Sequence, residues 1–193
     1  FTSACSAIIY RDGLLGDEFI GNSFVCEPVH NLVHCEVVHP DGVAFSSHRH
    51  AAEQESEFLA STDNFFRPTS VRTGPDGALW VVIEHPEWIP IKFRLTLDLR
   101  AGSNQGRIYR IYPVDQPPRP IEKLADADIA TLVGALDSPN GPQRDLAQQL
   151  LIAKNDSSSA SLLEKTVTDG KLPQGRLQAM CTLDGMGQLR AEV

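Results

Sequence analysis

The stretch Pro113-Val114-Asp115-Gln116-Pro117-Pro118-Arg119-Pro120 divides this sequence into two parts of different character. It holds four prolines in eight residues. Proline supplies no backbone N–H to a sheet and favours an extended, semi-rigid chain. Short β-branched and aromatic runs precede this stretch, whereas apolar residues recur with a helical period after it. We therefore predict two domains, residues 1–117 and residues 118–193.

The first domain has the pattern of short β-strands bounded by Gly, Pro, Asn and Asp. Turn sequences such as Arg11-Asp12-Gly13 and Pro75-Asp76-Gly77 separate several of the runs, and such residues favour tight reversals of the chain. The pattern predicts an antiparallel meander with strands at 3–10, 23–27, 31–38, 57–61, 69–73, 78–83 and 107–112.

The second domain has apolar residues at the spacing of helices that bury one face. Ile129, Leu132, Val133 and Leu136 stand at positions i, i+3, i+4 and i+7 of such a face. An offset of 32 residues also places an Arg, an Ala and a Leu of 144–151 on the same residue types in 176–183. We predict helices at 126–136, 142–153, 159–168 and 174–184, stacked as two repeats of an α-solenoid.

Composition excludes several classes of function. The chain has 193 residues with a formal net charge of −8, which removes the basic surface that carries most affinity for nucleic acid. Its apolar runs end well short of the roughly 20 residues needed to cross a bilayer. The chain opens at Phe1 without a leader. We therefore expect a processed product or a piece of something longer.

The four cysteines form no CxxC or CxxCH motif, which disfavours their use as metal or haem ligands. We expect Cys35 and Cys181 to be unpaired, with Cys181 in a helix core. If Ile9 faces Asn22 in the first hairpin, the same antiparallel register places Cys5 opposite Cys26. Two alternatives then remain for this pair: a cross-strand disulfide, or two buried thiols that are not bonded to each other.

Two polar motifs could suggest metal binding, but their sequence patterns favour a structural role. His30 and His34 have a metal-ligand spacing for a helix, but their segment has the pattern of a turn and a strand, where such positions lie roughly 13 Å apart. We predict no metal site there. His48-Arg49-His50 and the acidic alternation through Glu53, Glu55 and Glu57 predict a solvated loop with an exposed charged face, with a calcium cluster as the alternative.

The segments 57–68 (EFLASTDNFFRP) and 74–82 (GPDGALWVV) resemble a β-propeller blade of the sugar or sorbosone dehydrogenase type. The segments 24–34, 84–90 and 106–113, together with the helix at Arg144, are similar to the membrane-bound dehydrogenase family of planctomycete-type bacteria. In that family a propeller is followed by HEAT-like repeats and then by a c-type haem domain.

The resemblance implies an incomplete β-propeller followed by an α-solenoid of HEAT or armadillo type. Each blade uses four strands and closure takes at least four blades, so about two blades are expected here. The implied function is that of a piece of an exported quinoprotein-like dehydrogenase of the periplasm or cell envelope, inactive by itself. The parent would oxidise a sugar or other alcohol with pyrroloquinoline quinone and calcium, and would pass electrons to haem c outside this chain. The alternative is a non-catalytic scaffold that binds carbohydrate on its propeller face, or a protein through its helical repeats.

Three residues are catalytic candidates. Asp63 and Arg67 stand where a loop enters the innermost strand of the implied blade; the arginine offers a fork of donors to a carboxylate or polyol oxygen, and the aspartate can accept a proton. The alternative is an Asp63–Arg67 pair that only pins the loop. His85 can act as a base, or it is a structural loop histidine before proline. Soluble quinoprotein glucose dehydrogenase has Arg-Asn-Pro where this chain has Phe66-Arg67-Pro68, so cofactor-binding residues remain unassigned.

Overall fold

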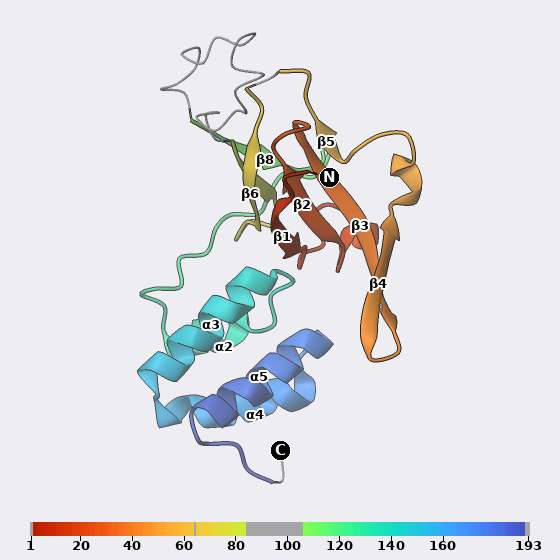
Figure 1. Cartoon of the computed structure of the whole chain (residues 1–193). Helices are drawn as coiled ribbons and strands as arrows, with labels where there is room; N and C mark the ends of the chain where they lie inside the picture. The colour runs from red at the N-terminus through yellow and green to blue at the C-terminus, as the bar shows by residue number, and fades with distance from the viewer. Residues whose placement is uncertain (1, 64, 84–105, 192–193) are drawn as a thin grey trace. The chain divides into compact units, whose positions relative to one another are not determined.

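A computed structural model describes residues 2–63, 65–83 and 106–191 and shows antiparallel β-sheets followed by helices (Figure 1). The chain forms two compact units. Unit 1 consists of Phe1–Tyr10, Leu14–Gly74 and Ala78–Pro118. Unit 2 consists of Arg11–Gly13, Pro75–Gly77 and Arg119–Val193. Two turns of the β half therefore belong to the helical unit.

The first sheet of unit 1 has the order β1-β2-β3-β4, and the short strand β5 also pairs with β3. All of its pairings are antiparallel, as the sequence predicted. Phe24 and Cys26 of β2 are completely buried, because alternate residues of a strand face the same side. The strands are β1 (Cys5–Ile9), β2 (Ser23–Glu27), β3 (Leu32–Asp41), β4 (Ala44–Arg49) and β5 (Leu59–Ala60).

The prediction of a solvated loop at His48-Arg49-His50 was wrong, because His48 and Arg49 belong to β4. Strand β3 continues to Asp41 and turns back through Gly42, whose φ of 62° suits a residue without a Cβ. Strand β4 was missed because its residues are exposed or only half-buried. It therefore carries no apolar alternation for a sequence reading to detect.

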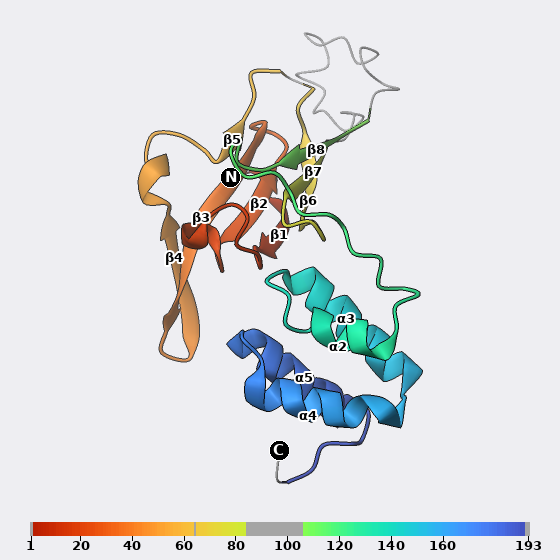
Figure 2. The ribbon, with the colours of Figure 1, turned by 180° about the vertical axis from the view of Figure 1, so that it is seen from behind.

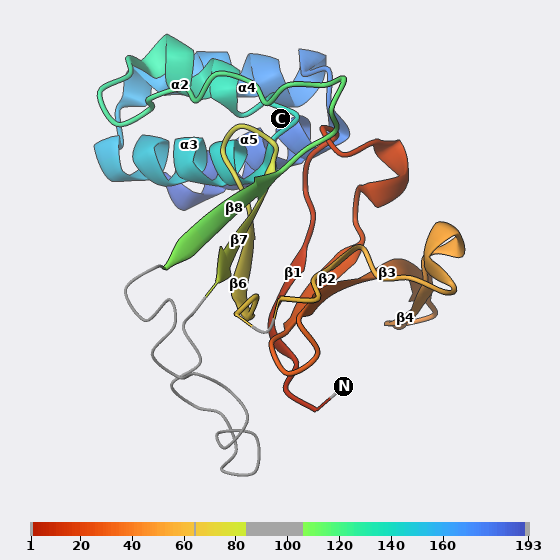
Figure 3. The same ribbon diagram turned by 90° about the horizontal axis from the view of Figure 1, so that it is seen from above.

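The second sheet of unit 1 contains β6 (Pro68–Thr73), β7 (Leu79–Ile83) and β8 (Arg107–Ile111) in that order. Leu79, Val81 and Ile83 of β7 point into the core of unit 1. This spacing confirms the predicted strand and its buried face. Figure 3 shows the three strands lying beside β1 and β2.

Ser6 of β1 joins the two sheets through its side chain. Its hydroxyl accepts a hydrogen bond from the Val71 amide at 2.9 Å and another from Arg72 Nη1 at 3.0 Å. Ser6 has a φ of 51° and lies where the register between β1 and β2 shifts, which is the mark of a β-bulge. The bulge thus turns a polar side chain of β1 toward β6.

Unit 2 contains four helices within the described residues, close to the predicted ranges (Figure 2). The first begins at Ile129 instead of 126, because the Asp128 side chain caps it by accepting a hydrogen bond from the Thr131 amide. None of the helices in the described parts has the length and apolar character that a membrane span requires. The helices are α2 (Ile129–Ala135), α3 (Gly141–Lys154), α4 (Ala160–Asp169) and α5 (Pro173–Gly185).

Helices α3 and α5 use the residues of the 32-residue offset in the same way. Ala147 and Leu151 of α3 are fully buried, and so are their counterparts in α5. Arg144 donates to the Ser138 carbonyl, and Arg176 donates to the Val167 carbonyl, so each arginine anchors the chain before its helix. Cys181 is exposed, which makes the prediction of a core position for it wrong.

Candidate functional site

Charged side chains gather at one end of the β6-β7-β8 sheet. The register aligns Pro68 of β6 with Ile83 of β7 and with Arg107 of β8. This alignment of the three strands brings the loop before β6 next to the start of β8, although the two segments are far apart in the sequence. Arg107 Nη1 lies 3.7 Å from Asp63 Oδ2. We call Asp63 and Arg107, together with Arg67 immediately before β6, the arginine site of unit 1.

Asp63 is held by the turn that it builds. Its Oδ1 accepts a hydrogen bond from the Phe65 amide at 2.9 Å, and its own amide donates to Ser61 Oγ at 3.0 Å. Aspartate favours such turns because its carboxylate reaches a backbone amide two residues later. Its side chain is 50% exposed, so Oδ2 remains open to solvent beside Arg107.

Arg67 is anchored to the loop before β3. Its Nη1 donates to the Pro28 carbonyl at 2.8 Å. Burial lowers the pKa of its guanidinium, and its buried Nε has no hydrogen-bond partner within the described residues. Next to it, Phe66 is buried against the ring of Tyr109 at 5.9 Å. Arg67 is therefore held at its guanidinium group, and its unpaired Nε is buried.

The two sequence candidates lie on the same loop before β6, but they do not form the Asp63–Arg67 pair that was given as the alternative. In the described part of the chain, Asp63 forms its ion pair with Arg107 and not with Arg67. Arg107 was missed by the sequence analysis, although aligning strands 69–73, 78–83 and 107–112 would have placed it beside the loop. His85 lies outside the described residues.

The arginine site has two guanidinium groups and one carboxylate in a chain with a formal net charge of −8. It therefore offers fixed donors to carboxylate or hydroxyl oxygens, with an acceptor next to them. A carboxylate-bearing quinone would have to displace Asp63 from Arg107. Among the described residues, no group of three or more His, Cys, Asp or Glu is placed to hold a metal ion. These residues do not build a quinone site by themselves.

A second polar cluster surrounds His34 on β3. Its Nδ1 lies 2.6 Å from Glu57 Oε2, and its Nε2 lies 3.3 Å from Glu36 Oε1. The His34 side chain is only 6% exposed, so both ring nitrogens are occupied by carboxylates and shielded from substrate. Arg49 Nη1 donates to Glu57 Oε1 at 2.9 Å. This arrangement ties the segment after β4 to the sheet and has a structural role.

The carboxylates of this cluster have displaced pKa values. Burial tends to raise the pKa of Glu57, but the hydrogen bonds from His34 and Arg49 outweigh burial and hold the pKa below its ordinary value. Glu53 differs, because burial raises its pKa and its Oε2 has no hydrogen-bond partner in the described structure. The predicted exposed acidic face was wrong for Glu53, which is only 8% exposed. Arg49 Nη1 donates to the Glu53 carbonyl at 3.1 Å, which fixes the backbone of Glu53 beside the His34 cluster.

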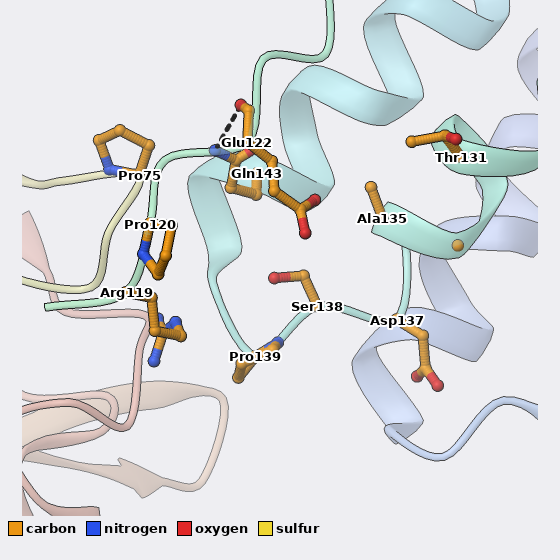
Figure 4. A pocket seen from close by; sticks show the side chains of 11 residues that line it. Pro75, Arg119, Pro120, Glu122, Thr131, Ala135, Asp137, Ser138, Pro139 and Gln143 are labelled. Atoms are coloured by element: carbon orange, nitrogen blue, oxygen red, sulfur yellow. Dashed lines mark hydrogen bonds between the residues drawn. The ribbon is translucent and has the colours of Figure 1, made fainter. Parts of the chain in front are cut away.

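Unit 2 contains a pocket of about 540 Å³ (Figure 4). Glu122 and Ser138 point into it, and Thr131 and Ala135 of α2 form another wall. A pocket of this size falls within the range of small-ligand sites. Gln143 also lines the pocket; it is 6% exposed and donates through Nε2 to the Glu122 carbonyl at 3.5 Å. The sequence analysis did not anticipate this pocket.

The fold and the site define a two-unit protein with antiparallel β-sheets, a helical unit and an arginine-rich cluster at one sheet end. Residues 1–115 match the family described as "Domain of unknown function (DUF7133)", and the chain belongs to this family. No curated protein and no solved structure gives a significant match.

Proposed function

We propose that this chain contributes to the substrate site of an exported dehydrogenase that oxidises a sugar or other alcohol. In this proposal the two sheets of unit 1 are neighbouring parts of a β-propeller, and the helices of unit 2 are HEAT-like repeats. The observation that carries the proposal is the contact of Asp63 with Arg107 at one end of the β6-β7-β8 sheet, with Arg67 on the same loop as Asp63. Loops at sheet ends are where rigid scaffolds present substrate-binding residues.

The roles of these residues follow from their donors and acceptors. Arg107 is partly exposed and would donate to a hydroxyl oxygen of the substrate, while the anchored Arg67 would fix a second oxygen. Asp63 would accept the hydrogen bond of a substrate hydroxyl through its exposed oxygen and orient the alcohol for oxidation. The quinone, the calcium and the haem that receives the electrons would come from parts of the protein other than the described residues.

The test is a dye-linked oxidation assay on the polypeptide that the gene encodes, with pyrroloquinoline quinone and calcium added and a panel of aldoses and polyols as substrates. We expect dye reduction with at least one of them. The change Arg107→Gln should raise KM about tenfold, the equivalent of one charge-assisted hydrogen bond. The matched control is Arg190→Gln, which removes a surface ion pair to Glu164 in unit 2 and should leave KM unchanged.

Two results would contradict the proposal. One is the absence of dye reduction with every substrate and of cofactor retention. The other is turnover by the isolated 193-residue chain, since we propose that its residues supply only part of the catalytic site.

The second candidate function is a non-catalytic scaffold that binds a carbohydrate or a protein. The observation that favours it is the pocket of unit 2, because Glu122, Ser138 and Thr131 offer polar groups to a ligand. A glycan array probed with the chain distinguishes the two candidates. Binding that is lost in Glu122→Ala and kept in Arg107→Gln would favour the scaffold.

A further inference from the structure

Two cysteines face each other across the first hairpin of unit 1. The register pairs Cys5 of β1 directly with Cys26 of β2. Side chains of directly opposed residues lie on the same face of a sheet, with Cβ atoms about 4.5–5.5 Å apart. Cα atoms of such pairs are separated by about 4.5–5.5 Å, which lies within the range that disulfides span. The backbone therefore brings these two thiols within bridging geometry.

The pairing depends on the β-bulge. Ile9 faces Ser23, and not Asn22 as the sequence analysis assumed, so an unbroken register would not align the two cysteines. The shift between Cys5 and Ile8 restores the alignment. Cys5 is also the first residue of β1, and a strand end can move toward its neighbour more easily than a strand centre.

The surroundings of the two sulfur atoms differ. Cys26 is completely buried in the core, whereas Cys5 is partly exposed and packs against that core. No disulfide joins them, and the Cys5 thiol contacts the Thr69 carbonyl with a separation of 3.6 Å. Burial, and then the proximity of Cys5, raise the pKa of the Cys26 thiol to about 12. Cys5 is thus the accessible thiol, and Cys26 is the protected one.

We propose that Cys5 and Cys26 form a reversible disulfide with a low-molecular-weight disulfide as the oxidant. The Cys5 thiolate attacks the oxidant, forming a mixed disulfide and releasing one thiol. The Cys26 thiol then gives its proton to the departing thiolate while its sulfur attacks the Cys5 sulfur, which forms the intramolecular bond and releases the second thiol. The protein loses two protons and two electrons, and the oxidant takes them up to become two thiols.

This disulfide would change the contacts between β1 of the first sheet and β6 of the second sheet. Moving the Cys5 sulfur toward Cys26 ends its contact with the Thr69 carbonyl of β6. It also links β1 to β2 covalently and closes the loop between them, which restricts the unfolded chain. The midpoint of urea unfolding of unit 1 should rise on oxidation and return after reduction with dithiothreitol.

The test uses the whole chain incubated with oxidised glutathione, alkylated and digested without reduction. Trypsin cuts after Arg11, and chymotrypsin cuts after Phe24 and Leu32, which separates Cys26 from Cys35. We expect a cross-linked pair of peptides that contain Cys5 and Cys26, with a mass lower by two hydrogen atoms than the sum of the two. Alkylation of both thiols after oxidation, or a bridge from Cys5 to Cys35, would overturn the proposal.

Variants keep the test decisive even if a core substitution impairs folding. Cys5→Ser changes the partly exposed member and should abolish both the cross-link and the shift in the unfolding midpoint. Cys181→Ser, on the exposed surface of α5, is the matched control and should retain both. If Cys5→Ser shows the same oxidation-dependent shift as the control, the disulfide is not its cause.

Discussion

Glu57 is the side chain whose removal tests the His34 cluster most sharply. The change Glu57→Gln keeps the size of the side chain and removes its charge. His34 Nδ1 and Arg49 Nη1 both lie within 2.9 Å of its carboxylate oxygens. An amide keeps one acceptor oxygen and turns the other into a donor, so His34 and Arg49 no longer both have a carboxylate oxygen as partner, and the charge of the acceptor is lost.

The expected loss follows from the burial of the cluster. Glu57 is 18% exposed and His34 is 6% exposed, so the bonds are poorly screened by water. Hydrogen bonds to charged groups contribute about 1.5–3 kcal/mol, against about 1 kcal/mol for neutral ones. Replacing two charged bonds with one neutral bond should cost about 2–5 kcal/mol. With a urea dependence of about 2 kcal/mol per molar, the unfolding midpoint of unit 1 falls by about 1–2.5 M.

The loss also depends on pH. The pKa of Glu57 is lowered in the folded protein, so its stabilising contribution is present above its unfolded pKa and is lost as pH falls through the folded value. The difference between wild type and Glu57→Gln should be full at pH 7 and should vanish at strongly acidic pH.

Urea unfolding followed by tryptophan fluorescence measures this loss, because both tryptophans of the chain, Trp80 and Trp88, lie in the β half of the sequence. The matched control is Glu55→Gln, since Glu55 is exposed in the same segment, and it should leave the midpoint unchanged. If Glu57→Gln behaves like this control at pH 7, or if its loss persists in acid, the cluster does not stabilise unit 1 as described.

Two further predictions concern buried carboxylates and use urea unfolding. Glu53→Gln should stabilise unit 1 by about 1 kcal/mol at pH 8, because it removes the charge of a buried carboxylate whose Oε2 has no hydrogen-bond partner among the described residues. Its pKa is raised by burial, so this gain should shrink as pH falls below the folded pKa; an equal gain at all pH values would refute it. Asp12→Ala should destabilise unit 2 by about 2–4 kcal/mol, because the completely buried Asp12 accepts one charged hydrogen bond from Arg119 and one neutral hydrogen bond from Asn140. Circular dichroism at the helix band measures this loss, and a loss no larger than that of the exposed control Asp126→Ala would contradict it.

The parts of the fold that the sequence predicted are those with a buried periodic face. The core residues of β7 and of helices α3 and α5 recur at the spacing of their elements, and these elements lie where expected. Strand β4 was missed because pairing with β3, and not burial, holds it in place. The bulge at Ser6 was missed because a single polar residue with positive φ leaves no periodic signal.

The arginine site could be predicted only in part. The sequence singled out Asp63 and Arg67 through a resemblance, yet the partner of Asp63 is Arg107, more than forty residues away. That contact depends on the register of three strands, and register is fixed by turn geometry and by the core faces of all three together. Similarly, the inward position of Glu53 depends on the network around Arg49, which no local pattern reveals.

In the proposed function, Arg67 and Arg107 bind a sugar or alcohol at the end of the β6-β7-β8 sheet. The most direct measurement is nuclear magnetic resonance of the arginine Nε–H groups of the isotopically labelled chain during titration with monosaccharides. We predict saturable shifts of the Arg67 and Arg107 signals, with no shift for Arg190. If the Arg67 and Arg107 signals stay unchanged, as the Arg190 signal should, the arginine site does not bind the substrate and the proposed function fails.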